Sequence, residues 1–149
     1  MDALPQMPDD LATFWFLIRR VAGQMDRSGE ALFQQELGIS LAQFLVLSVV
    51  EAHPGRMNQQ GIADRLGLTK GTISRQVDNA VSAGLMTVET AQHNRRENVV
   101  TLTQDGAELV RRGDEVFEQE RAAMLHAVDP SDMQAAIRVL GAMSQTLSS

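Results

Sequence analysis

The sequence contains no cysteine and no long apolar run, and each absence excludes a class of protein. Without cysteine there is no disulfide scaffold, no zinc site with thiolate ligands and no redox sensor based on thiol oxidation. The longest mainly apolar stretch, residues 44–50 with Ser48 inside it, is far shorter than the roughly 20 residues of a membrane-spanning helix. Residues 1–10 carry no basic side chain and no apolar core, so they do not resemble a secretory signal. We therefore expect a cytoplasmic protein that has no membrane partner.

Size and composition are typical of one folded domain. The chain has 149 residues, of which 44% are apolar and 21% are charged, so neither disorder nor a shortage of core residues is expected. The three histidines, His53, His93 and His126, share no helix face and offer no local metal site. Phosphate-binding glycine loops and nucleophile motifs are also missing. We expect a single domain over residues 1–149 with no enzymatic activity, no metal and no cofactor.

The net charge of −6 argues at first sight against binding to nucleic acid. The distribution of charge along the chain does not argue against such binding. Residues 56–100 carry six basic and four acidic side chains, whereas the rest of the chain carries seven basic and fifteen acidic ones. A binding surface depends on local charge rather than on the total, so a nucleic-acid interface is expected in the middle third of the chain.

Apolar spacing predicts a mainly helical fold that begins with one long helix. Over residues 9–36 the apolar side chains alternate in steps of three and four, with Ser28 in one slot, which indicates the seam of an amphipathic helix. The seam residues are Leu11, Phe14, Ile18, Val21, Met25 and Leu32. Gly38 ends this helix. Ser40 then caps a second helix over residues 41–52, which is apolar almost all round and should be buried.

Two short helices follow at residues 58–66 and 69–83, and their spacing is typical of a helix-turn-helix. The first half of the second helix carries hydroxyl, amide and cationic side chains, which suit a major groove. The candidate DNA-binding residues there are Thr69, Lys70, Thr72, Ser74, Arg75 and Gln76. Arg75 matches guanine and Gln76 matches adenine as bidentate partners. The alternative is a solvated face, which would normally also carry acidic residues, and none precedes Asp78.

Two extended runs, residues 85–89 and 98–102, flank a polar stretch at 90–97 and predict a β-hairpin with an exposed tip. The tip carries three further candidate DNA-binding residues, Asn94, Arg95 and Arg96. Adjacent arginines are able to enter a minor groove or to hold phosphates. Two arginines alone would be better explained as a solvated turn. Directly after a helix-turn-helix, they favour a winged helix-turn-helix over about residues 40–103.

Two more helices are expected over residues 103–127 and from Asp129 onward, with Pro130 in the first turn. The seam of the last helix consists of Met133, Ile137, Leu140, Met143 or Ser144, and Leu147. Together with the seam of the first helix, this is more apolar surface than a chain of this size covers comfortably by itself. We therefore expect residues 9–36 and 104–147 to form a dimerisation region for a homodimer. An intramolecular bundle would cover part of the same surface.

Several short motifs in the central region occur in a familiar order. They are residues 61–69 (GIADRLGLT), 72–78 (TISRQVD), 83–86 (AGLM), the paired Arg95 and Arg96, and 100–106 (VTLTQDG). In this order and spacing the chain resembles the MarR family of winged-helix transcriptional regulators, although each motif alone is weak. The resemblance implies a homodimer that binds a pseudo-palindromic operator in double-stranded DNA as a repressor or, less often, as an activator. One departure concerns the wing, where the two aspartates usual in the family are replaced by Ala91 and Asn94. Arg95 is therefore expected to be held more loosely or to point differently.

The resemblance also implies regulation by a small, often aromatic, anionic ligand between the dimerisation and DNA-binding parts. The candidate ligand-binding residues are Phe14, Trp15, Arg19 and His53, with Arg19 as the cation. Trp15 can instead be packed core beside the seam, and Arg19 can be a solvated helix position.

Two other functions compete with that of a regulator. An enzyme would need catalytic motifs that the sequence lacks. A winged-helix interaction module without DNA binding stays open, because the total charge is acidic and the wing has lost its acids. The cations Lys70, Arg75, Arg95 and Arg96 argue against that alternative.

Overall fold

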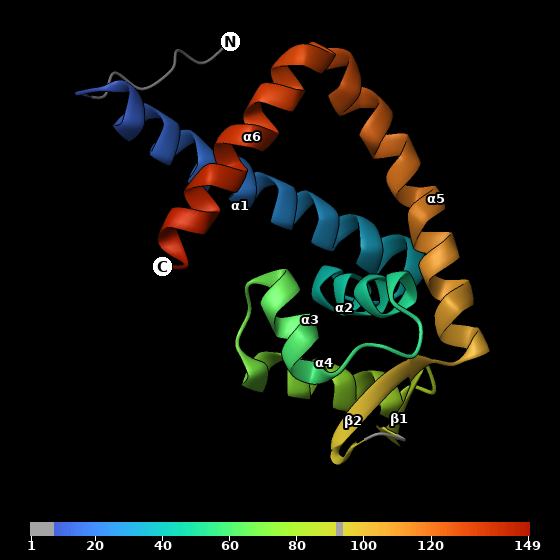
Figure 1. Ribbon diagram of the computed structural model, residues 1–149. Helices are drawn as coiled ribbons and strands as arrows, with labels where there is room; N and C mark the ends of the chain where they lie inside the picture. Colours follow the sequence, from blue (N-terminus) through green and yellow to red (C-terminus); the bar gives the residue numbers. More distant parts are fainter. Residues whose placement is uncertain (1–7, 92–93) are drawn as a thin grey trace. The chain divides into compact units, whose positions relative to one another are not determined.

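The computed structural model describes residues 8–91 and 94–149 (Figure 1). Within these ranges it describes all side chains except those of residues 91 and 94–97. Its elements are α1 (Asp10–Leu37), α2 (Leu41–Ala52), α3 (Gln59–Leu66), α4 (Lys70–Ser82), β1 (Met86–Ala91), β2 (Asn94–Leu102), α5 (Gln104–Ala127) and α6 (Pro130–Leu147). They divide into two compact units, one that ends at Gly113 and one that begins at Asp114, so the division falls within α5. The mainly α, winged helix-turn-helix fold predicted from the sequence is confirmed.

Helix ends lie where the sequence places capping residues. α1 begins after Asp9, whose carboxylate accepts a hydrogen bond from the Ala12 amide (2.7 Å), and it ends at Gly38 in the left-handed conformation. The predicted N-caps of three later helices are also present, at Ser40, Thr69 and Asp129. Among the described residues, no single helix is long and apolar enough to span a membrane; α1 and α2 reach that length and composition only as a pair, and the pair is bent by 80°.

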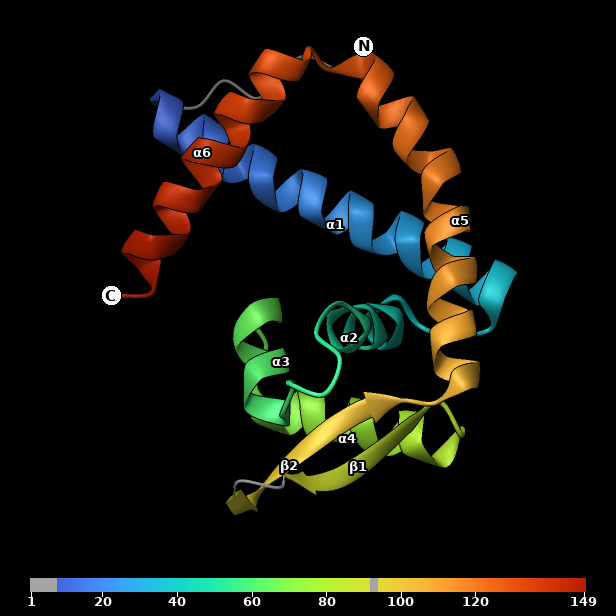
Figure 2. The ribbon, with the colours of Figure 1, turned by 45° about the vertical axis from the view of Figure 1, so that its right-hand side comes forward.

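The hairpin is longer than the sequence suggests. β1 and β2 pair antiparallel from Met86 opposite Leu102 to Ala91 opposite Asn94, with a register shift after Thr90 (Figure 2). The hairpin is confirmed, but the extended runs predicted at residues 85–89 and 98–102 were too short, since most of the polar stretch at 90–97 also belongs to the strands. A hairpin that is solvated near its tip tolerates polar residues on both faces, so polarity alone was a poor sign of where the strands end.

A single buried core holds the helix-turn-helix and the hairpin on α2. Its residues come from α2, the following loop, α3, α4, both strands and the start of α5: Val46, Leu47, Val50, Met57, Ile62, Ala63, Ile73, Val77, Ala80, Met86, Val100, Leu109 and Val110. The expectation that α2 is central is confirmed, although one side of it is open, because Leu45 is 37% exposed. Met57 also joins the sheet, since its carbonyl accepts a hydrogen bond from the Val100 amide (2.8 Å).

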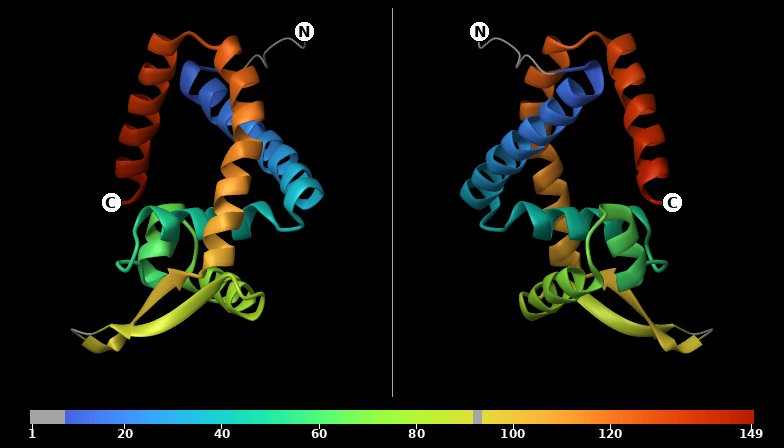
Figure 3. Two further views of the ribbon diagram at one scale, coloured as in Figure 1. Left: turned by 90° about the vertical axis from the view of Figure 1, so that its right-hand side faces the viewer. Right: turned by 90° about the vertical axis from the view of Figure 1, so that its left-hand side faces the viewer.

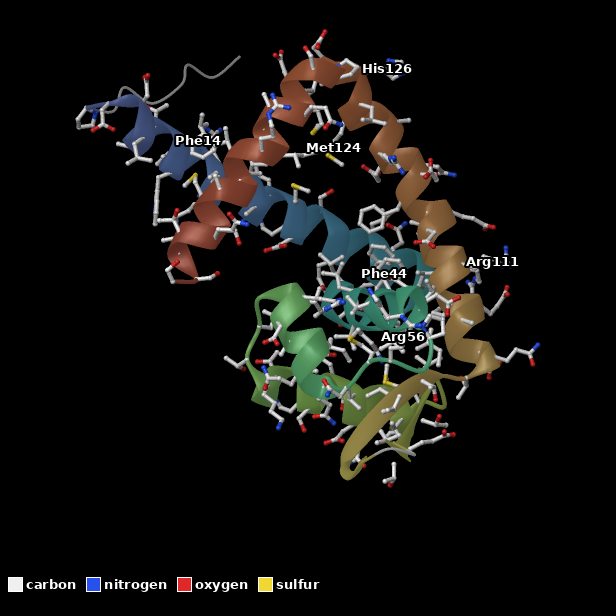
Figure 4. All side chains as sticks on the ribbon, in the orientation of Figure 1. Phe14, Phe44, Arg56, Arg111, Met124 and His126 are labelled. Atoms are coloured by element: carbon white, nitrogen blue, oxygen red, sulfur yellow. The ribbon has the colours of Figure 1, made fainter. Side chains whose placement is uncertain are left out.

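α1 and α2 are fixed to each other at their junction. The rings of Phe33 and Phe44 are stacked, with centroids 4.4 Å apart, and both side chains are buried (Figure 4). The Glu30 carboxylate accepts a hydrogen bond from the Leu41 amide (3.0 Å) at the start of α2, where a negative charge is favourable. α5 also packs closely on α2, since a methyl group at Gly113 would overlap the Phe44 ring.

The start of α5 is attached to the base of the hairpin. The Thr103 amide donates to the Leu85 carbonyl (3.1 Å), and the Thr103 hydroxyl donates to the Gly84 carbonyl (2.7 Å). The same hydroxyl oxygen accepts a hydrogen bond from the Gly106 amide (3.1 Å). Gly106 lies so close to the Leu85 carbonyl oxygen that a Cβ atom there would overlap it.

The second unit begins at Asp114 and contains the C-terminal part of α5 and the whole of α6 (Figure 3). No residue of α6 is buried. The large apolar side chains that this unit leaves exposed, by 39–70%, are Met124, Leu125, Val128, Ile137, Val139, Leu140 and Leu147. The seam that the sequence predicts for the last helix is therefore largely uncovered in the single chain.

Candidate nucleic-acid interface

α3 and α4 form a helix-turn-helix whose turn is fixed by caps. Gly67 ends α3 in the left-handed conformation, with φ of 65°, and the Leu68 amide donates to the Ala63 carbonyl (3.0 Å). Thr69 then caps α4, and its Oγ1 accepts a hydrogen bond from the Thr72 amide (3.2 Å). The second helix of such a unit is the one that enters a major groove, so α4 is the candidate recognition helix (Figure 2).

One face of α4 is buried and the opposite face is open to solvent. Ile73, Val77 and Ala80 are fully buried in the core of the first unit. Arg75 lies on the opposite face and is exposed, as is Lys70 in the first turn. Neither cation forms an ion pair with another described residue. Both charged groups are therefore available to a phosphate or a base edge.

The other predicted residues of α4 lie at the edges of that open face. Ser74, Gln76 and Thr72 are half-buried. The hydroxyl oxygens of Thr69 and Thr72 are 2.9 Å apart and share a hydrogen bond. These two threonines therefore stabilise the start of α4, whatever else they contact.

Sequence reasoning missed three exposed residues of the same face: Gly71, Asp78 and Asn79. Each is three or four positions from Arg75, and that spacing places side chains on one side of a helix. The chemistry of the first half of the helix guided the sequence interpretation, whereas the spacing from Arg75 was the signal that would have found them. Asp78 adds a negative charge to the face, so its positive potential comes from Lys70 at the N-terminal end of α4 and Arg75 near the middle.

The wing residues Asn94, Arg95 and Arg96 belong to β2, whose backbone is described from Asn94 onward. Their side chains lie outside the described residues, so their role in binding stays a prediction. The backbone gives one constraint. Asn94 pairs with Ala91 beyond the register shift, so the two positions at which the MarR family, which the sequence resembles, usually has aspartates lie opposite each other at the end of the ladder.

A cavity lined by two of the predicted ligand-binding residues lies on α1. It is an open hollow of about 560 Å³ lined by Ala12, Trp15, Phe16, Arg19 and Arg20. Trp15 is 51% exposed, so among the described residues it is not packed core. Two of the four predicted ligand-binding residues, Trp15 and Arg19, are thus brought together one helical turn apart.

The other two predicted ligand-binding residues do not line this hollow. Phe14 is half-buried on α1 (Figure 4). His53 ends α2, where its Nδ1 lies 2.9 Å from the Val49 carbonyl oxygen and its Nε2 lies 3.4 Å from an Arg65 Nη2. Because a carbonyl only accepts, Nδ1 carries the proton and Nε2 accepts from Arg65. His53 therefore contacts the helix-turn-helix rather than α1.

Within the part of the chain whose side chains are described, no group of three or more histidine, aspartate or glutamate side chains is arranged to hold a metal ion.

Three comparisons place this geometry among known proteins. Residues 37–97 match the model of the MarR family. An uncharacterized protein of Mycobacterium tuberculosis, Rv2011c, is 29% identical over 129 residues, which are 87% of this chain and 88% of that protein. The fold is similar to that of S. aureus MepR in a complex with DNA, with a TM-score of 0.80 and 21% identity over 90% of this chain and 97% of MepR. It is also similar to that of the transcriptional regulator PcaV from Streptomyces coelicolor in complex with its natural ligand, with a TM-score of 0.74 and 21% identity over 94% of this chain and 98% of PcaV.

The family model covers the end of α1, the helix-turn-helix and most of the hairpin. The similarity of fold extends further, over at least nine-tenths of the chain. Residues 37–97 are therefore similar to the MarR family, and the chain has the fold of the solved MepR and PcaV structures.

Proposed function

We propose that this protein is a homodimeric transcriptional regulator that binds double-stranded DNA in a sequence-specific way, most simply as a repressor. The observation that carries the proposal is the open face of α4, with Arg75 at its middle and no ion pair to another described residue. A similar fold, MepR, is known in a complex with DNA. The core that joins α4 to α2, α3 and the hairpin gives the helix the rigid support that base reading needs. The proposal assigns no enzymatic activity to the chain.

A second copy of the chain is the proposed cover for the exposed apolar side chains. In the first unit these include Leu11, Val21 and Met25 on the seam of α1, which are 47–65% exposed. In the second unit they include Ile137, Leu140 and Leu147 of α6. Large exposed apolar patches on a folded chain are typical of protein interfaces. A dimer of this kind would read two half-sites about one helical turn, or roughly 10 bp, apart.

The Arg75→Ala variant is expected to lose about 1–3 kcal/mol of binding free energy per half-site, because a bidentate contact to guanine is worth that amount. The loss should be confined to the preferred sequence and should relax the preference at one base pair in each half-site. Fluorescence anisotropy with a duplex selected by the unmodified protein, and with an unselected duplex of equal length, measures both effects. The matched control is Arg138→Ala, which removes an exposed arginine from α6 and should leave both affinities nearly unchanged.

The Arg96→Ala variant tests phosphate contacts by the wing, in contrast to the base contact proposed for Arg75. If the wing holds phosphates, this variant weakens binding to both duplexes alike and lowers the dependence of affinity on salt by about one ion. Equal losses on the two duplexes for Arg75→Ala would remove its base-reading role. A wild-type protein that binds neither duplex would instead favour the interaction module without DNA binding.

A small aromatic anion is the proposed ligand of the hollow on α1. Trp15 offers an exposed aromatic face, and the Arg19 guanidinium, one turn further along, has no ion pair with a described residue. The ring of an aromatic acid would stack on Trp15, and its carboxylate would form an ion pair with the Arg19 guanidinium. Phe33, Phe44 and Glu30 fix α1 to α2, and α2 carries the core under α4. A change at α1 thus has a path to the recognition helix, and its size is limited to the ligand's differential affinity for the two states, typically 1–3 kcal/mol.

Titration with salicylate is expected to quench the fluorescence of Trp15, the single tryptophan, in step with release of the selected duplex. Arg19→Ala should abolish both responses, whereas Arg27→Ala, which removes an exposed arginine two turns along α1 outside the hollow, should abolish neither. Quenching without DNA release would show a binding site that is not a switch. If neither signal responds to salicylate or to related aromatic acids, the hollow is not the ligand site.

A further inference from the structure

The open face of α4 contains a ridge of three exposed residues, Gly71, Arg75 and Asn79. They are spaced four apart, so they follow one another along the same side of the helix. At 1.5 Å per residue the ridge is about 12 Å long. With one base pair for every 3.4 Å of duplex, that length spans between three and four base pairs. Arg75 is the only member of the ridge that the proposed function uses.

Gly71 has no explanation inside the described part of the chain. Its φ is not positive, in contrast to Gly38, Gly55, Gly67 and Gly84, so no unusual backbone conformation requires it. Apart from its chain neighbours and the backbone of its own helix, a Cβ atom built at Gly71 would have no described heavy atom within 4 Å. Alanine would therefore fit, and it is a better helix former than glycine. The glycine leaves bare backbone on a face that points away from the core.

The role of Asn79, in the last turn of α4, is also unexplained by contacts within the chain. Its side chain is exposed and makes no hydrogen bond to another described residue, although its carbonyl accepts the helical hydrogen bond from the Ala83 amide. Asparagine is a poor residue for a helix interior because its amide competes with the backbone. Asn58 shows the contrast, since its side chain caps α3. An exposed amide without an internal partner is suited to a partner outside the chain.

We propose that the whole ridge faces the DNA: Gly71 lets the duplex approach the α4 backbone closely, and Asn79 reads an adenine one turn beyond the base read by Arg75. An asparagine amide pairs with adenine through two hydrogen bonds, to N6 and N7. A glycine is the residue expected where a nucleic-acid backbone approaches a helix most closely. This inference rests on the proposed DNA-binding function and adds a specificity-determining residue and a close-approach position to it.

The test uses the full-length variants Gly71→Ala and Asn79→Ala, with Gly23→Ala as the matched control. Gly23 is a helical glycine of α1 whose added Cβ would meet only the flexible end of Arg27. All three changes replace a poor helix former, so each should raise the melting temperature by about 1–4 °C. DNA binding is measured by anisotropy on a duplex selected from a random pool by the wild-type protein and on an unselected duplex of equal length.

Stability and affinity should move in opposite directions for the two ridge variants. Gly71→Ala should weaken binding to both duplexes by about tenfold or more, because the methyl group separates the helix from the duplex. Asn79→Ala should weaken binding to the selected duplex alone by about tenfold, and a new selection with it should lose an adenine preference at one position in each half-site. Gly23→Ala should bind both duplexes as the wild type does.

Three results would overturn the inference. Wild-type affinity in both ridge variants would show that the ridge does not face DNA. Equal losses on the two duplexes for Asn79→Ala would indicate a phosphate contact instead of base reading. A lower melting temperature in either variant would reveal an internal role for that residue. Failure of the wild-type protein to select any sequence would contradict the proposed function itself and is therefore distinguishable from these.

Discussion

Gly106→Ala is expected to destabilise the protein by about 3 kcal/mol or more, at the upper end of what overpacking causes. The added Cβ would overlap the carbonyl oxygen of Leu85, which is backbone and unable to rotate away. That carbonyl also accepts the hydrogen bond from the Thr103 amide, so moving it breaks the attachment of α5 to the hairpin. Chemical denaturation followed by circular dichroism gives the change in free energy of unfolding.

Gly71→Ala is a matched control for this variant, because both glycines lie in the first turn of a helix that follows a threonine cap. The added methyl group meets no described atom at Gly71, so the control should keep or gain stability. A Gly106→Ala variant as stable as the wild type would mean that α5 does not approach Leu85 as closely as the structure shows.

Leu140→Glu is expected to abolish the proposed homodimer, leaving unstable monomers or unfolded chain. In the single chain Leu140 is 46% exposed and sits among the other uncovered apolar residues of α6. If a second copy covers this seam, the variant buries a charge without a partner, and the effect amounts to several kcal/mol. In an obligate dimer, stability and DNA binding both depend on the contact between the two copies, so the proposed dimer predicts that both fall together. Light scattering at micromolar concentration measures the molar mass.

Gln145→Glu adds the same charge to an exposed position of α6 that lies off the seam, and it should remain dimeric. A wild-type protein that is a stable, fully helical monomer at micromolar concentration would contradict the dimer. A dimer that survives Leu140→Glu would place the interface elsewhere on the chain.

Features that depend on a few neighbouring residues were predictable from the sequence. Ser40, Thr69 and Asp129 cap helices because a short polar side chain bonds to an amide two or three positions later, and that contact is local. Apolar spacing indicated the buried face of α4 only in part: Ile73 and Val77 are buried, but Val81, at the next step of four, is 41% exposed and Ala80 is buried instead. The length of the hairpin was not predictable in the same way, because the pairing of Ala91 with Asn94 depends on the partner strand.

Contacts between distant segments could not be predicted from the sequence pattern. Nothing in the residues around Gly106 or Gly113 reveals that one approaches the Leu85 carbonyl and the other the Phe44 ring. The candidate site also has one feature that the sequence predicted and one that depends on contacts between distant segments. Arg75 was found from its chemistry, whereas the separation of His53 from Trp15 and Arg19 follows from where α2 ends and which helix it touches.

The hydrogen bond from the Val100 amide to the Met57 carbonyl has a consequence for how the winged region opens. Val100 is fully buried and is paired with Val88 in the hairpin, so its amide is held where the strand, the α2–α3 loop and the core meet. Solvent deuterium reaches this amide when its hydrogen bond to Met57 opens. If the wing and the recognition helix open as one cooperative unit, amide exchange at Val100 should be as slow as exchange at the buried Ile73 and Val77 of α4; faster exchange at Val100 would show that the hairpin opens by itself.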